Sequence, residues 1–198
     1  GVPIKIKGKL FNAGIANAPI GQAQVQFLGH SKVAMTKGKG SFSLGHLYVD
    51  CSEVNYLQIE KSGFYRNRVA FSCENVKPNV YIYPAAHIDQ IAAETDFKLD
   101  AQSGVLVGHA SFNHSVKMQF WGPEERSGSS APARGHDFYY DKDGVLNTAR
   151  NRTSMNGNFV IMGAPEGLSY IQAFNKEGET LSYWPVYLAP STINIYSQ

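Results

Sequence analysis

Two aspartates stand two positions apart in the segment Asp141-Lys142-Asp143-Gly144. Carboxylates at such a spacing can both face one hard cation, so the segment resembles the beginning of a calcium-binding loop. The twelfth position of that loop would be a bidentate glutamate, and here it is Arg152. An Asp-Gly pair is also a strong signal for a hairpin turn. We therefore expect a turn and no resident cofactor, with calcium at Asp141 and Asp143 as the alternative.

Two short segments that are typical of strands, Phe138–Tyr140 and Tyr183–Tyr187, place aromatic rings on both faces of the strand. In a strand, one face packs on the core and the opposite face is exposed or covered by other parts of the molecule. Exposed planar rings stack on sugars and anchor protein interfaces, whereas inward rings fill the core. Core packing is the alternative for each ring. The candidate binding residues are Trp121, Tyr139, Tyr140, Tyr183 and Trp184.

Motifs of nucleophilic, phosphate-binding or dinucleotide-binding enzymes do not occur in the sequence. It contains no Gly-x-Ser-x-Gly segment and no glycine loop of the Walker or dinucleotide type. Its six histidines form neither His-x-x-x-His nor His-Glu-x-x-His, the spacings that hold zinc on a helix. We therefore predict that the chain is not an enzyme and has no catalytic residues.

The two cysteines, Cys51 and Cys73, fall within one predicted domain and form no Cys-x-x-Cys motif. A disulfide between them would stabilise the fold by about 3 kcal/mol in the chain-entropy model. The composition is typical of exported proteins, so we predict this disulfide, with buried free thiols as the alternative. The expected location is secreted, periplasmic or on the cell surface, although no signal peptide is present in this chain. No apolar run approaches the ~20 residues of a membrane helix.

Charge is nearly balanced, with 18 basic and 16 acidic residues and a net charge of +2. Lys5, Lys7 and Lys9 alternate with other residues, which puts three ammonium groups on one face of a predicted strand. This pattern is typical of a solvent-facing strand. Nucleic-acid binding would need a wider basic surface with aromatic residues in it, so we expect no nucleic-acid partner.

Composition favours an all-β chain. Hydrophobic residues make up 43% and charged residues 17% of 198 residues, which is enough apolar material for two cores. Tyr and Phe number 11 each and favour strands, and 19 Gly with nine Pro supply turns. Strands are predicted in the first half at 4–10, 23–28, 41–44, 56–60, 68–71 and 79–83, and in the second half at 104–108, 115–121, 138–140, 156–161, 167–174, 183–187 and 192–196.

The order of these strands and turns indicates that the chain contains one structural unit as a tandem repeat. We predict a first β-sandwich at 1–84, a linker at 85–100 and a second β-sandwich at 101–198. Within the linker, Ile88, Ile91 and Ala92 have helical spacing, so a short helix is expected there. A segment rich in Gly, Ser, Pro and Ala predicts an inserted loop at 122–136 in the second unit.

The repeated pattern resembles carboxypeptidase-regulatory-like domains, which have a prealbumin-like (transthyretin-like) sandwich. In the first unit the matching residues are Gly8, Pro19, Ile20, Ala23, Val25, Gly40, Phe42, Gly63 and Phe64. In the second they are Gly104, Gly108, Val116, Gly157, Phe159, Pro165 and Gly167, without the Pro-Ile-x-x-Ala segment. The resemblance implies two tandem immunoglobulin- or prealbumin-like antiparallel sandwiches. It also implies a non-catalytic accessory module of surface or secreted proteins.

Two functions follow as expectations. The first is an extracellular or cell-surface structural or adhesive module, including a subunit of a surface assembly or filament. In that case edge strands of the sandwiches would pair with other copies. The second is a carbohydrate-binding module that uses exposed aromatics. The expected partner is accordingly a protein or a glycan at the cell surface.

Overall fold

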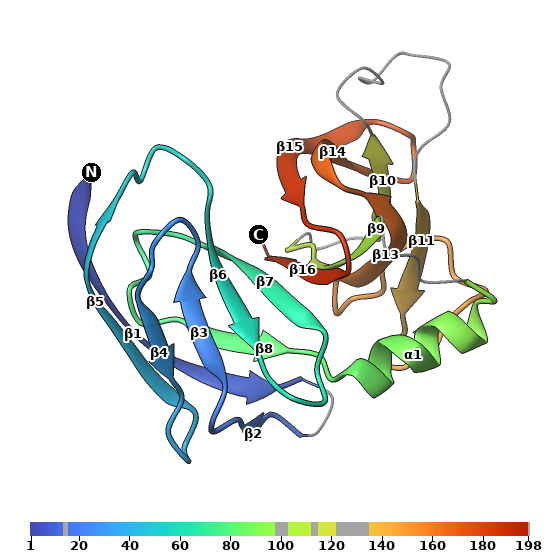
Figure 1. The fold of residues 1–198 in the computed structure, drawn as a ribbon. Coiled ribbons are helices and arrows are strands. Elements are labelled where there is room, and N and C mark those ends of the chain that lie inside the picture. Colours follow the sequence, from blue (N-terminus) through green and yellow to red (C-terminus); the bar gives the residue numbers. More distant parts are fainter. Residues whose placement is uncertain (14–15, 98–102, 112–114, 122–134, 198) are drawn as a thin grey trace. The chain divides into compact units, whose positions relative to one another are not determined.

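The chain forms two compact units, Gly1–Asp89 and Gln90–Gln198, which we call unit 1 and unit 2. The computed structural model describes residues 1–13, 16–97, 103–111, 115–121 and 135–197 (Figure 1). Most of the predicted inserted loop, residues 122–134, therefore lies outside the described residues. No helix in the described ranges is both long and apolar enough to cross a membrane.

Unit 1 contains two sheets. In the first, the long strand β1 (Val2–Asn12) lies between β5 (Ser41–Val49), which is antiparallel to it, and β8 (Asn79–Ile82), which is parallel. The short β2 (Ala18–Pro19) pairs with the end of β1. The second sheet runs antiparallel in the order β7 (Arg66–Phe71), β6 (Asn55–Glu60), β3 (Gln24–Phe27) and β4 (Val33–Met35).

Buried and exposed residues alternate along β1, which places apolar side chains of this strand in the core of unit 1. Ile6 and Leu10 are fully buried, whereas the lysines between and beside them are exposed. In the second sheet, Phe27 packs edge-on against Phe71 with ring centroids 5.6 Å apart. Burying each of these large side chains stabilises the fold by roughly 1.5–3 kcal/mol relative to leaving it exposed.

Unit 2 also contains two sheets. Strand β9 (Ser103–His109) lies between β13 (Asn158–Pro165), antiparallel to it, and β16 (Thr192–Ser197), parallel to it. Strand β11 (His136–Tyr140) pairs with β13, and the short β12 (Leu146–Asn147) pairs with β11. The second sheet has the order β10 (Lys117–Trp121), β14 (Gly167–Phe174), β15 (Thr180–Leu188) and is antiparallel.

The core of unit 2 draws side chains from both of its sheets, including Phe159 of β13 and Phe120 of β10. The predicted all-β class, with antiparallel sandwiches and one short helix, is confirmed. One feature differs from a purely antiparallel arrangement: each unit pairs its first strand in parallel with its last strand. Such a pairing joins the two ends of a unit and is not visible in residue alternation.

The single helix of the described residues, α1, spans Ala85–Glu94 and buries Ile88 and Ile91. Within unit 1, the Tyr65 hydroxyl donates a hydrogen bond of 2.6 Å to the Asp89 carboxylate, which raises the pKa of Tyr65. Cys51 and Cys73 form the predicted disulfide. It joins the segment after β5 to the segment after β7 and thereby ties the two sheets of unit 1 together.

Candidate functional site

The outer face of the three-stranded sheet of unit 2 concentrates exposed aromatic side chains. Along β15, Trp184, Val186 and Leu188 point into the core, so the residues that alternate with them, from Tyr183 to Tyr187, point outward. Two of those outward residues are tyrosines, and 37% of Tyr183 and 55% of Tyr187 is exposed. The sequence Tyr-Trp-Pro-Val-Tyr therefore gives this strand one apolar inner face and one aromatic outer face.

Cross-strand register extends this surface over all three strands. Trp121 of β10 lies opposite Tyr170 of β14, and Tyr170 lies opposite Pro185 of β15. Leu168, which is 44% exposed, lies opposite Tyr187. Residues directly opposite on one face have Cβ atoms only about 5 Å apart, so these side chains form one continuous surface. We call it the aromatic face, and it comprises Trp121, Leu168, Tyr170, Tyr183, Pro185 and Tyr187.

Ring stacking orders the centre of the aromatic face. The rings of Tyr170 and Tyr183 lie 5.0 Å apart between centroids and are nearly parallel, with 7° between their planes. Each ring fixes the orientation of the other, so less side-chain entropy is lost when a ligand contacts them. Such a surface offers planar apolar contact together with phenolic hydroxyls, a combination that suits both sugars and protein interfaces.

A buried amide lies in the same outward register. Gln172 pairs with Gln119 and Tyr183, and it is only 2% exposed. Its Nε2 donates to the Thr180 hydroxyl at 2.7 Å, but its Oε1 is buried and has no hydrogen-bond partner among the described residues. A buried polar atom without a partner costs about 1–3 kcal/mol. The same condition holds for the indole Nε1 of Trp121, so two polar atoms in the outward register of this sheet have no hydrogen-bond partner within the described ranges.

Of the five predicted binding residues, Trp121 and Tyr183 belong to the aromatic face and three are buried. Tyr139, Tyr140 and Trp184 are 0%, 5% and 7% exposed. Tyr139 and Trp184 are members of the unit 2 core. In β11 and β15 the inward register includes Tyr139 and Trp184, so the core alternative applies to these two rings. Tyr140 directly follows Tyr139 and is buried on the opposite face of β11.

The buried hydroxyl of Tyr139 has a structural role. It accepts a hydrogen bond from the backbone N–H of Met118 at 2.8 Å and donates one to the Asp137 carboxylate at 2.7 Å. Burial raises the pKa of the Tyr139 phenol well above its usual value, and the charge of Asp137 raises that pKa further. The hydroxyl thus links β11 of one sheet to β10 of the other.

Sequence reasoning missed Tyr170, Leu168 and Tyr187 as members of the site. Tyr187 and Tyr183 have the same outward parity in their strand, which is a usable signal. The positions of Leu168 and Tyr170 opposite β15 depend on the register between strands, and a single sequence does not encode register as a local pattern.

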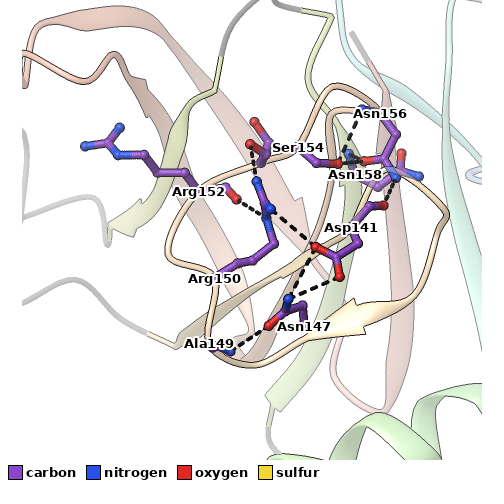
Figure 2. A network of polar contacts seen from close by, with 9 residues as sticks. Asp141, Asn147, Ala149, Arg150, Arg152, Ser154, Asn156 and Asn158 are labelled. Carbon is purple, nitrogen blue, oxygen red and sulfur yellow. Dashed lines mark hydrogen bonds and ion pairs between the residues drawn. The ribbon is translucent and has the colours of Figure 1, made fainter.

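The predicted calcium residue Asp141 lies in a polar network between β11 and β13, shown in Figure 2. Its carboxylate accepts hydrogen bonds from Asn147 Nδ2 at 3.1 and 3.3 Å and pairs with the Arg150 guanidinium at 3.3 Å. Its backbone carbonyl accepts a hydrogen bond of 2.6 Å from Asn156. Arg150 also donates to the backbone carbonyls of Arg152 and Thr153.

This network fixes the segment between β12 and β13, and the Arg150 guanidinium already provides a positive charge beside the Asp141 carboxylate. Asp143 lies beside it in an exposed turn that Gly144 closes with a positive φ of 79°. No cluster of three or more His, Cys, Asp or Glu side chains that would suit a metal ion occurs in the described ranges. The predicted turn is present, and calcium at Asp141 and Asp143 stays an untested alternative.

A concave surface lies on unit 1. It is an open hollow of about 470 Å³, with Met35 and Phe64 among its apolar lining and Glu60 and Arg66 among its charged lining. Glu60 and Arg66 pair with each other at 3.0 Å, and both side chains are about half exposed. Such a pair contributes about 0–1 kcal/mol and leaves little unsatisfied charge for a ligand.

Comparisons with known proteins give only distant likenesses. No protein-family model matches the chain, and no curated protein matches it. The solved structures that are similar to it include the following three. The TIE protein of Bacillus anthracis has 9% identity and a TM-score of 0.28, with 98% of this chain and 32% of that chain covered. This chain thus spans about a third of that protein.

The minor pilin GBS52 of Streptococcus agalactiae has 14% identity and a TM-score of 0.30, with 98% of this chain and 94% of that chain covered. A putative carbohydrate-binding protein of Bacteroides uniformis has 10% identity and a TM-score of 0.27, with 95% and 100% covered. At these identities and TM-scores, the likenesses assign the chain to no family.

Proposed function

We propose that this chain is a non-catalytic adhesive module of an extracytoplasmic surface and that it holds its partner through the aromatic face. The observation that carries the proposal is the cross-strand cluster of aromatic side chains on the outer face of β10, β14 and β15, with Tyr187 55% and Tyr183 37% exposed. Large contiguous apolar patches are rare on the surface of monomeric soluble proteins, and those that occur often mark interaction sites.

The disulfide supports the extracytoplasmic part of the proposal. Cys51 and Cys73 are joined, and disulfides persist in oxidising compartments such as the periplasm, the cell surface and the secreted space. The resemblance of the glycine and phenylalanine pattern to carboxypeptidase-regulatory-like domains fits the same location and a non-catalytic role. We propose membership of that group on this pattern alone.

The aromatic face is a better candidate than the edge strand β15 for the surface through which unit 2 contacts a partner. Strand β15 ends its sheet and is nine residues long, a length that would favour pairing with another chain. Pro185 in its middle lacks a backbone N–H, however, and edge prolines are a common means of preventing such pairing. We therefore place adhesion on the side chains of the sheet, and strand exchange into a filament is the less favoured mode.

A carbohydrate-binding module is the second candidate function. The nearly parallel Tyr170 and Tyr183 rings, together with the outward Tyr187, give both stacking surface and hydroxyl groups. Sugars use both, because their C–H faces pack on rings and their hydroxyls need hydrogen bonds. A protein partner would use the same rings as anchors, so the nature of the partner separates the two functions.

An array that carries defined glycans in one half and purified cell-surface proteins in the other tests both functions. The full chain is compared with Tyr187→Ser, Tyr183→Ser and the control Met155→Ser, because Met155 is 98% exposed and lies outside the aromatic face. We expect the intact chain and the control to bind in one half, and each tyrosine variant to lose roughly tenfold or more in affinity, as anchor residues do.

Binding confined to the glycan half would select the carbohydrate-binding function, and binding confined to the protein half would select the adhesive one. No binding in either half, or equal binding by the tyrosine variants and the control, would contradict the proposed site. Circular dichroism of each variant checks that the fold is intact.

A further inference from the structure

We propose that the outer face of the first sheet of unit 1 binds a linear anionic polysaccharide through Lys5, Lys7 and Lys9. These three residues, which we call the lysine row, are all exposed on β1, and the residues between them, Ile6 and Gly8, are buried. Side chains two positions apart on a strand stand about 7 Å apart. The row therefore presents three ammonium groups along about 14 Å of β1, which pairs with a strand on each side.

No acidic side chain within the described ranges pairs with the lysine row. Among the described residues, none of the three ammonium groups makes an ion pair. Cross-strand neighbours of the row are uncharged, since Ser43 lies opposite Lys7, and Ser41 and Asn79 flank Lys9. Unit 1 as a whole carries ten Lys and Arg against five Asp and Glu, whereas the rest of the chain carries eight against eleven. The positive charge of the chain is thus gathered on unit 1.

Aromatic rings lie at both ends of the lysine row. At one end the row continues into Phe11, whose ring stacks on Tyr81 at 5.4 Å, and Tyr81 is 41% exposed. At the other end Tyr48, which lies opposite Pro3, is 70% exposed. Its neighbours Leu47 and Val49 are buried, which places the Tyr48 side chain on the same outer face as the lysines.

The three lysines with an aromatic ring at each end of the row indicate which class of ligand this surface would bind. An extended chain with several anionic groups can contact all three lysines at once, and a monovalent small molecule cannot. Rings that flank the charges favour a polymer with sugar faces over one that is only charged, because C–H faces of sugars pack on tyrosine. Sulfate and carboxylate groups on sugars share this chemistry, and both are tested below. This surface belongs to unit 1 and is separate from the aromatic face.

Isothermal titration of the full chain tests the inference, with a heparin decasaccharide as the sulfated probe and an oligogalacturonate of equal length as the carboxylated one. The variants are Lys7→Glu, Tyr81→Ser and the control Lys176→Glu, which changes the net charge equally at an exposed lysine of unit 2. We expect at least one polysaccharide to bind. Lys7→Glu should weaken it about tenfold or more, Tyr81→Ser about threefold, and Lys176→Glu less than twofold.

Two further arms separate specific binding from ion exchange. Log Kd against log salt concentration should have a slope of magnitude about 2 for three contacts. Linear polyphosphate and a single-stranded oligonucleotide should bind more weakly than the polysaccharide and should not respond to Tyr81→Ser. No binding of either polysaccharide at low salt, equal effects of Lys7→Glu and Lys176→Glu, or tighter binding of polyphosphate or the oligonucleotide would overturn the inference.

Discussion

Gly108 lies directly beneath the ring of its cross-strand partner Phe159, so close that a Cβ atom at Gly108 would overlap the ring edge. Unit 1 contains the same contact between Gly8 of β1 and Phe42 of β5. In both units the glycine is in the first strand, and the phenylalanine follows a positive-φ glycine by two residues, Gly40 or Gly157. The missing side chain lets the phenylalanine ring lie against the sheet inside the core.

Gly108→Ala should therefore destabilise the protein by about 1–3 kcal/mol, because the added methyl group overpacks the core at Phe159. Gly38→Ala is the matched control, since a Cβ there meets open space and Gly38 has no positive φ. Urea unfolding of the two variants and of the unchanged chain measures the difference. Similar free energies of unfolding for both variants would show that the ring contact does not constrain position 108.

Removal of the disulfide should lower stability by about 3 kcal/mol. The bridge closes a loop with a sequence separation of 22, and cross-linking reduces the entropy of the unfolded chain. The double variant Cys51→Ser, Cys73→Ser and the reduced chain should show the same lowered melting temperature. If a reductant lowered the melting temperature of the serine variant as well, its effect would not arise from this bridge.

Tyr139→Phe should lower stability near neutral pH by about 1–3 kcal/mol, because the Met118 N–H and the Asp137 carboxylate lose their shared partner. The same variant should flatten the loss of stability in alkali. The phenol pKa is raised in the folded state, so above about pH 10 the unfolded chain releases its proton first and the free energy of unfolding falls as pH rises.

Urea unfolding at about pH 8 and about pH 11 measures this difference in slope. Tyr65 and Tyr83, whose pKa values are also raised, contribute with the same sign and remain in the variant. An identical alkaline slope in the variant and the unchanged chain would rule out Tyr139 as a contributor.

Calcium should leave the melting temperature of the chain unchanged. The Asp141 carboxylate already has Asn147 and Arg150 as partners, and a calcium ion would have to displace a fixed guanidinium charge. Thermal unfolding in millimolar calcium and in excess chelator measures the effect. A calcium-dependent rise that Asp141→Asn abolishes would favour the calcium-binding alternative.

Much of the fold could be predicted from the sequence because alternation reports burial directly. The comb of lysines between Ile4, Ile6 and Leu10 predicts β1, and Ile88 with Ile91 predicts α1, which spans the expected residues. The predicted strand at 41–44 is too short, since β5 continues to Val49. The continuation crosses Gly45 and His46, where the register between β1 and β5 shifts and His46 adopts a positive φ of 55°.

The aromatic face could be predicted only in part, because the direction of a side chain depends on strands that are distant in the sequence. Alternation along β15 separates Tyr183 from Trp184, but it does not say which of the two points inward. That choice depends on the facing sheet, where Tyr139 and Phe159 fill the same core. The pairing of Tyr170 with Trp121 and Pro185 likewise depends on strands that are distant in sequence.

The most direct test of the aromatic face as the binding surface is hydroxyl-radical footprinting of the full chain with and without the ligand that the array identifies. We predict that oxidation of Tyr183 and Tyr187 falls several-fold on binding, while the exposed reference residues Met35 and Met155 are oxidised at an unchanged rate. Unchanged oxidation of both tyrosines, with protection at Met155 or on unit 1, would contradict the account.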